Sequence, residues 1–154
     1  MSDVDVIVLD IDGGAMTAEC LASIDRQTMR PANVIVFDNG SVSPSARATH
    51  RSATNLGFAA GANAAVRHTT SPYVALVNND VVLDDDWLAT VRGAMPDSVA
   101  AVQTILRRDA STIDGAGIDV SDGTIRQIGS GFPVGASLPS AWGVSATATL
   151  YRRE

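Results

Sequence analysis

Polar side chains follow three apolar stretches of this sequence, and their types could bind a cation beside a phosphate. Carboxylate and amide oxygens are ligands that Mg²⁺ and Mn²⁺ prefer in proteins. A cation bound there could neutralise charge that develops on a departing phosphate group. The three polar segments are Asp10-Ile11-Asp12, Asp38-Asn39-Gly40-Ser41 and Asn78-Asn79-Asp80.

Each polar segment stands at the end of a predicted strand. Residues 4–9, 34–37 and 73–77 are short apolar runs, as is typical of strands buried in a parallel sheet, and residues 17–24 and 58–67 between them suit helices. Ligands of open α/β sheets bind beyond the carboxyl ends of the strands. The sequence therefore predicts an α/β fold whose open, mostly parallel sheet has helices on both faces and the three polar segments at one edge.

The second half of the chain predicts smaller elements. Residues 113–139 are rich in Gly, Ser and Asp, which suggests a hairpin of 118–120 with 124–128 and a flexible loop. Residues 146–152 suit a closing strand. In the first helix, Met16 is expected on the buried face together with Cys20.

Four motifs occur in one order along the chain: VIVFDNGS (34–41), NLGFAAGAN (55–63), LVNNDVVL (76–83) with Trp87-Leu88 after it, and GVSATATLYRRE (143–154). Together they resemble the family 2 glycosyltransferases, especially the rhamnosyltransferase-like branch, over almost the whole length. The resemblance implies a GT-A fold, a nucleotide-diphosphate sugar donor, a divalent cation, Mg²⁺ or Mn²⁺, and transfer of the sugar with inversion.

The resemblance assigns recognition of the nucleotide's base to the second polar segment and binding of the metal to the third. Asp38 would accept a hydrogen bond from the imide N–H of a uracil or thymine ring, because an ionised carboxylate is only an acceptor. The donor would then be UDP- or dTDP-linked. Asp80 would bind the metal, with Asn78 as a second candidate ligand.

Three further residues would line the nucleotide site. Gly57 opens the second helix, where a missing side chain lets the backbone approach the donor. Asn63 would support the site with its amide. Asp12 stands where the family has a polar or aromatic neighbour of the base, and it adds negative charge there.

The first strand also resembles a different class of enzyme. VIVLDIDG (6–13) is similar to the opening motif of haloacid dehalogenase-type phosphatases, in which Asp10 would be the nucleophile and Asp12 the acid/base. Gly14 replaces the expected Thr, and the chain contains no lysine. A non-catalytic nucleotide-binding or interaction module is a further alternative.

No catalytic residue is predicted within the chain. Asp38 and Asp80 already have roles in the resemblance, and the family's general base would come beyond Glu154. We therefore expect residues 1–154 to form a single donor-binding domain without the acceptor part, whose transferase activity is low or absent.

Composition restricts the possible partners. The net charge of −6, from 17 acidic residues against 11 basic ones, argues against nucleic acid and suits a site that takes a cation. No apolar run is long enough to span a bilayer. The first residues lack the positively charged segment that opens a secretory signal peptide, so we expect no such signal. The lone Cys20 suggests a buried thiol in a reducing compartment. We expect a cytoplasmic protein, with peripheral membrane contact and a homodimer as open possibilities.

Overall fold

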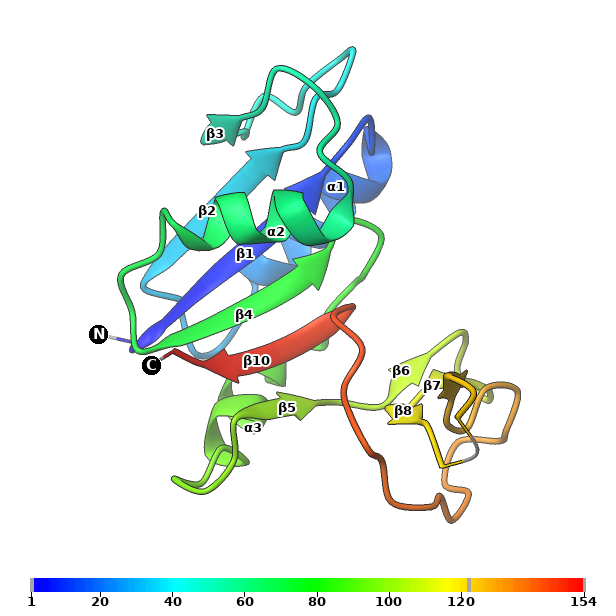
Figure 1. The fold of residues 1–154 in the computed structure, drawn as a ribbon. Coiled ribbons are helices and arrows are strands. Elements are labelled where there is room, and N and C mark those ends of the chain that lie inside the picture. Colours follow the sequence, from blue (N-terminus) through cyan, green and yellow to red (C-terminus); the bar gives the residue numbers. More distant parts are fainter. Residues whose placement is uncertain (1, 122, 154) are drawn as a thin grey trace.

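The computed structural model describes residues 2–121 and 123–153, so Glu154 lies outside the described part. The central sheet of the described chain contains β1 (Val4–Asp10), β2 (Asn33–Asp38), β3 (His50–Arg51), β4 (Tyr73–Asn78), β5 (Ala101–Gln103) and β10 (Ala148–Arg152). Their order is β3-β2-β1-β4-β10-β5, and the sheet twists from β3 at one side to β5 at the other (Figure 1).

The strands that carry the polar segments are neighbours in this sheet. β1 pairs in parallel with both β2 and β4, so that Asp10 lies opposite Asp38 and Leu9 lies opposite Asn78. β10 runs antiparallel between β4 and β5. The prediction that all three polar segments meet at one edge of a mostly parallel sheet is confirmed.

Helices cover both faces of the sheet. α1 (Ala15–Asp25) and α3 (Trp87–Gly93) pack on the face that contains Val4, Val6 and Val8. α2 (Phe58–Val66) packs on the opposite face, against Ile7, Ile35 and Phe37. Alternate residues of a strand face opposite sides, and burying one such side chain stabilises the fold by about 1.5–3 kcal/mol. Both layers of the predicted fold are present.

The small residues of α2 allow its close approach to the sheet. A Cβ at Gly61 would lie 2.9 Å from Asn39 Nδ2 and 3.0 Å from Leu9 Cδ1. Ala62 and Ala65 are buried in the same contact.

No helix in residues 2–121 and 123–153 is long and apolar enough to cross a membrane.

One expectation about α1 is wrong. Met16 is 53% exposed, whereas Thr17, Cys20, Leu21 and Ile24 are buried. The helix begins at the carboxyl edge of the sheet, where Thr17 turns toward Asp10. Met16 therefore lies on the outer side of the first turn.

Two small antiparallel strand pairs form a lobe beside the sheet, β6 (Leu106–Arg107) with β7 (Ile113–Gly115) and β8 (Ile118–Asp119) with β9 (Arg126–Gln127). Figure 1 shows this lobe near the start of β10. The predicted hairpin corresponds to β8 and β9, with shorter strands. The β6–β7 pair was not predicted, and bridges from Thr112 to Pro133 and from Ile118 to Gly143 tie the expected loop to these strands.

A buried carboxylate anchors the other end of β1. Asp5 is 0% exposed and accepts hydrogen bonds from the backbone N–H groups of Thr70 (2.7 Å) and Ser71 (2.9 Å) and from Asn33 Nδ2 (2.8 Å) and Ser71 Oγ (2.9 Å). Burial by itself would raise the pKa of Asp5, but these donors together hold the pKa below its ordinary value of 3.8.

We expect protonation of the Asp5 carboxylate to lower the free energy of unfolding at acidic pH. Because the pKa of Asp5 is lower in the folded state, its contribution is complete above pH ~4 and is lost as the pH falls through the folded pKa. Asp5→Asn should lower the free energy of unfolding at pH 7 by about 1–3 kcal/mol and flatten its dependence on pH between about 5 and 2. Urea unfolding at several pH values measures both, with the exposed Glu19→Gln as control. Parallel pH curves for the wild type and Asp5→Asn would contradict the assignment.

Candidate nucleotide and metal site

Asp10 joins the tips of β1 and β4 to the start of α1. It is 1% exposed, and its Oδ1 accepts hydrogen bonds from Thr17 Oγ1 (2.6 Å), Asn79 Nδ2 (2.9 Å) and the N–H of Gly13 (3.3 Å). A buried carboxylate needs such donors to offset its lost hydration. Asp10 therefore fixes the turn that carries Asp80.

This arrangement does not fit the phosphatase alternative. The nucleophile of such an enzyme must reach the phosphorus atom of its substrate, whereas Asp10 is buried and bound by three protein donors. Asp12 is exposed but already bound, because its Oδ1 accepts a hydrogen bond from the N–H of Ser43 (3.0 Å). Its own N–H donates to Ser41 Oγ (2.8 Å). Asp12 therefore connects the β1 tip to the loop after β2.

Asp38 lies fully buried at the tip of β2. Its Oδ1 accepts a hydrogen bond from the N–H of Ser41 (2.9 Å), and its Oδ2 lies 2.9 Å from Nε of Arg51. Arg51 Nη2 donates to the carbonyl of Ser41 (2.7 Å). Sequence reasoning missed Arg51. No periodic pattern marked its two-residue strand, and a lone arginine near a turn carries no motif.

Asn39 is a second residue that sequence reasoning did not single out. It is 3% exposed, and its Nδ2 donates to Asn55 Oδ1 (3.2 Å) and to the carbonyl of Gly57 (3.2 Å). Its Oδ1 accepts a hydrogen bond from the N–H of Leu56 (3.1 Å). Asn39 thus clamps the loop that opens α2 onto the tip of β2.

Gly57 caps α2 with a left-handed backbone, φ 79°, which favours glycine. A Cβ there would meet no atom of the described chain within 4 Å, so the space in front of this loop is open. Asn63 lies farther along α2. It lines a groove of about 350 Å³ together with Val74, Leu76 and Tyr151, and this groove does not include Asp80. The structure therefore brings Gly57 to the edge of the sheet but not Asn63.

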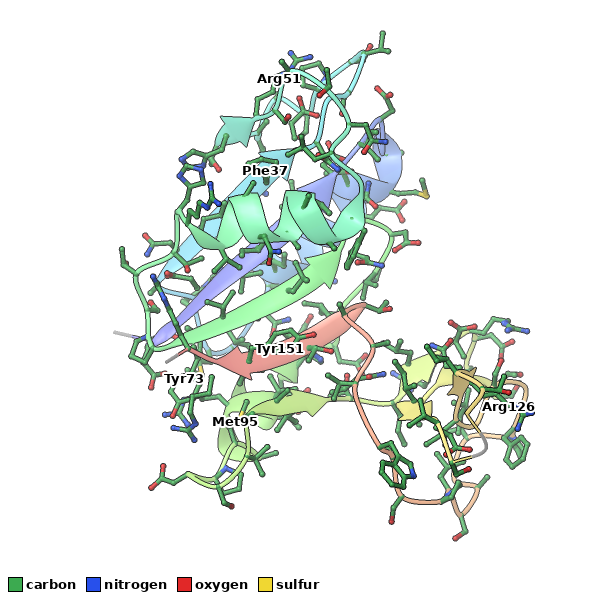
Figure 2. All side chains as sticks on the ribbon, viewed as in Figure 1. Phe37, Arg51, Tyr73, Met95, Arg126 and Tyr151 are labelled. Atoms are coloured by element: carbon green, nitrogen blue, oxygen red, sulfur yellow. The ribbon has the colours of Figure 1, made fainter. Side chains whose placement is uncertain are left out.

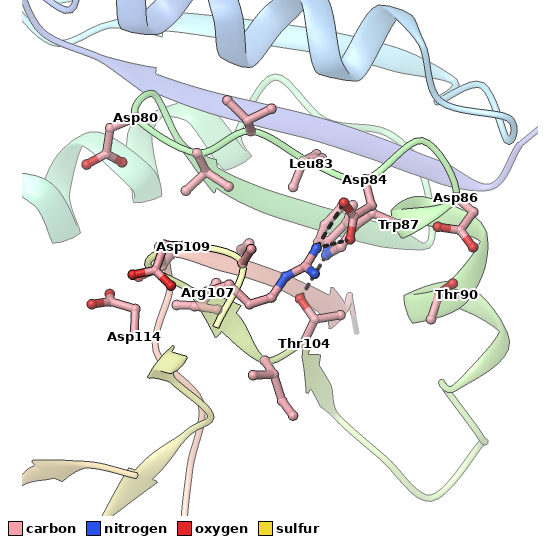
Figure 3. Close-up of a pocket in the computed structure, with 17 residues that line it drawn as sticks. Asp80, Leu83, Asp84, Asp86, Trp87, Thr90, Thr104, Arg107, Asp109 and Asp114 are labelled. Atoms are coloured by element: carbon pink, nitrogen blue, oxygen red, sulfur yellow. Dashed lines mark hydrogen bonds and ion pairs between the residues drawn. The ribbon is translucent and has the colours of Figure 1, made fainter. Parts of the chain in front are cut away.

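Asp80 borders a cavity of about 700 Å³ between the turn after β4 and residues 104–114. Asp109 and Asp114 lie with Asp80 at one end of this cavity, and Arg107 crosses its middle to pair with Asp84 at 2.8 Å (Figure 3). Asp80 is exposed, so a ligand in the cavity can reach its carboxylate.

Trp87 fixes one wall of this cavity. It is 6% exposed, and its Nε1 donates to Thr104 Oγ1 (3.0 Å). This contact connects α3 to the segment that leads into the lobe.

The oxygen atoms of Asp80 and of Asn78, two residues before it, are of the type that a hard cation prefers. Oδ1 of Asn78 is buried and has no hydrogen-bond partner in the described chain. Among residues 2–121 and 123–153, no three His, Cys, Asp or Glu side chains gather closely enough to hold an ion alone. Oxygen donors with incomplete coordination match a metal that also binds substrate phosphates.

Cys20 does not compete for such an ion. Its thiol packs below the turn after β4 and donates weakly to the carbonyl of Asn78 at 3.5 Å. Burial, with the nearby charges of Asp80 and Asp10, raises the pKa of this thiol to about 12. A protonated thiol is a poor metal ligand, so Cys20 is the buried side chain that the sequence predicted.

Residues 6–154 match the family model described as "Glycosyl transferase family 2". The chain belongs to glycosyl transferase family 2. This agrees with the order of the four motifs and with the sheet edge described above.

Solved structures share the fold of this family member. The mannosyltransferase PcManGT from Pyrobaculum calidifontis, in complex with GDP-Man and Mn²⁺, aligns at TM-score 0.60 and 25% identity over 69% of this chain and 36% of its own. TarS from S. aureus aligns at TM-score 0.52 and 19% identity over 58% of this chain and 19% of its own. A structure of TarS residues 1–349 in complex with UDP-GlcNAc aligns at TM-score 0.51 and 20% identity, over 58% and 30%. These likenesses support the GT-A fold.

The matched region is about a third or less of the length of these solved proteins. A comparison with curated proteins gave no match.

The turn at Gly13 should tolerate no larger residue. A Cβ at Gly13 would lie 2.7 Å from Asp10 Oδ1 and would collide with Thr17 Oγ1 and Asn79 Nδ2. Gly13→Ala should therefore destabilise the fold by about 1–3 kcal/mol. Gly93→Ala is the matched control, since a Cβ there meets no described atom within 4 Å. Thermal unfolding of both variants measures the difference, and equal midpoints would refute the packing described here.

Proposed function

We propose that this glycosyl transferase family 2 domain binds a nucleotide-diphosphate sugar together with a divalent cation and serves transfer of the sugar with inversion. The observation that carries the proposal is the exposed Asp80, which lines the cavity. Two residues before it, Asn78 has a buried side-chain oxygen without a hydrogen-bond partner in the described chain. The complex of PcManGT with GDP-Man and Mn²⁺ supports the choice of ligand and ion. The rhamnosyltransferase-like branch rests on the Asn78-Asn79-Asp80 sequence and is part of the same proposal.

The proposed metal ligands are Asp80 and Asn78. When bound, Mg²⁺ or Mn²⁺ would neutralise charge on the departing nucleoside diphosphate. Asp10 and Asn79 would hold the turn so that the Asp80 carboxylate keeps its position. This division of roles gives the ion to an exposed carboxylate, Asp80, and the structural role to a buried one, Asp10.

The nucleotide is proposed to lie over the tips of β1 and β2. Asp38 would accept the imide N–H of a uracil or thymine ring, and Asp12 and Gly57 would border the ribose and phosphates. Asn63 has the least support, because its side chain lines a separate groove. We propose no general base among residues 2–121 and 123–153. We also propose a cytoplasmic location, and we keep peripheral membrane contact and a homodimer as further proposals.

A thermal-shift screen tests the ligand class. A ligand that binds only the folded state raises the unfolding temperature by mass action. The unfolding temperature should be measured with UDP-, dTDP- and GDP-linked sugars, each once in the presence of Mn²⁺ and once in the presence of EDTA. We expect a shift for UDP- or dTDP-linked sugars that needs the ion.

Replacing Asp80 should remove the effect of the ion. For the wild type, calorimetry should give UDP an affinity at least roughly 10-fold higher with Mn²⁺ than with EDTA, about 1.4 kcal/mol. Asp80→Ala should bind UDP equally in both conditions, because the carboxylate that joins ion and protein is gone.

Asp97→Ala is the control for that experiment. Asp97 is fully exposed in the turn after α3, where it pairs with Arg152 at 3.7 Å, away from the strand tips. This variant should keep the Mn²⁺ dependence of the wild type. Equal UDP affinity of the wild-type protein with Mn²⁺ and with EDTA would show that the metal assignment is wrong. Metal-independent binding without any sugar transfer would favour the non-catalytic module.

A further inference from the structure

Arg51 lies above the buried carboxylate of Asp38. The Arg51 side chain is 50% exposed, whereas the Asp38 side chain is 0% exposed. Figure 2 shows Arg51 beyond the tip of β2, at the same edge of the sheet as the candidate nucleotide site. A ligand that approaches Asp38 therefore meets the guanidinium first.

The contact between the two groups leaves hydrogen-bonding capacity on both. Nε of Arg51 is 2.9 Å from Oδ2 of Asp38, yet this oxygen has no hydrogen bond of adequate geometry in the described chain. Nη2 of Arg51 donates to the carbonyl of Ser41. A guanidinium carries more N–H groups than these two contacts use. Arg51 balances the charge of this buried oxygen, and the oxygen keeps acceptor capacity for a further partner.

We infer that Arg51 is a specificity-determining residue that contacts the base of the bound nucleotide and forms, with Asp38, an acceptor–donor edge. This inference rests on the proposed function. Asp38 Oδ2 supplies the acceptor, and the neighbouring guanidinium supplies N–H donors to a carbonyl oxygen of the same ring. For a base to reach this edge, the half-exposed Arg51 side chain must move away from Asp38 Oδ2.

Such an edge suits a uracil or thymine ring. Their N3–H has a carbonyl group on each side, so a donor beside Asp38 meets an acceptor in either orientation of the ring. Cytosine has no N3–H and carries an amine at one of these positions, which would face the guanidinium donors. The Arg51–Asp38 pair should therefore favour UDP over CDP.

The experiment compares three ligands in the presence of Mn²⁺: UDP, CDP and ribose 5-diphosphate, which has no base. Arg51→Gln should weaken UDP binding roughly 10-fold, as expected for loss of one hydrogen bond from a charged group. It should also reduce the preference for UDP over CDP, because Asp38 alone would then distinguish the two bases. Binding of ribose 5-diphosphate should not change, because the contact is with the base.

Two further variants control for charge and folding. Arg47→Gln removes an arginine of the loop that precedes β3, and it should leave all three affinities unchanged. Arg47 pairs with Asp25 at the surface at 2.7 Å. Arg51→Lys keeps a positive charge beside Asp38 without the planar set of donors. It should unfold at the wild-type temperature and still show a reduced preference for UDP.

The outcomes separate this inference from the proposed function. The role of Arg51 would be overturned if Arg51→Gln kept the wild-type preference for UDP over CDP. If the Gln variant does not fold, the same result with a folded Arg51→Lys would overturn it. If the variant lost the same affinity for UDP and for ribose 5-diphosphate, Arg51 would contact the phosphates and not the base, and this outcome would also overturn the inference. If the wild-type protein binds none of the three ligands, the proposed function and this inference both fail.

Discussion

A single buried oxygen, Oδ1 of Asp10, accepts hydrogen bonds from the start of α1 and from the turns after β1 and β4. Removing a carboxylate from water costs several kcal/mol unless donors replace its hydration. The three segments therefore keep one arrangement in which every donor faces this oxygen. Asp80 directly follows Asn79, one of the donors, so the position of the exposed carboxylate depends on the buried one.

The acidic residues of the sheet divide into two groups by burial. Asp5, Asp10 and Asp38 are buried, and their oxygens meet backbone and side-chain donors of the protein. Asp80 is exposed beside the cavity. Unpaired charges at the surface are well hydrated, whereas buried ones must be compensated. Asp5 and Asp10 therefore stabilise the fold, whereas Asp38 keeps one oxygen without a hydrogen bond and Asp80 stays available to a cation.

The cavity beside Asp80 depends on contacts between segments that are distant in sequence. The Arg107–Asp84 ion pair spans it, but exposed pairs of this kind contribute only about 0–1 kcal/mol. Trp87 contributes more, because a buried aromatic side chain covers roughly 150–250 Å² and its indole N–H is bonded to Thr104. The wall of the cavity is thus held mainly by packing of α3 against the segment that enters the lobe. The ion pair adjusts the charge of the cavity more than its shape.

The strands at the centre of the sheet follow from the sequence, because β1, β2 and β4 are mostly apolar runs of the kind that a parallel sheet covered on both faces buries. The outer elements were not predicted. β3, β5, β6 and β7 have only two or three residues each, too few for a periodic pattern to appear.

For the site, the sequence by itself determined which residue types stand at the strand tips and that these tips share an edge. It could not distinguish Asp10 from Asp80, since each is a carboxylate that follows an apolar run. Their burial depends on Thr17 and Asn79, which approach Asp10 only after the chain folds. The pairing of Arg51 with Asp38 likewise needs β3 to add to the sheet beside β2. Only tertiary structure decides these roles, because the environment of a charge is set by neighbours in space and not by neighbours in sequence.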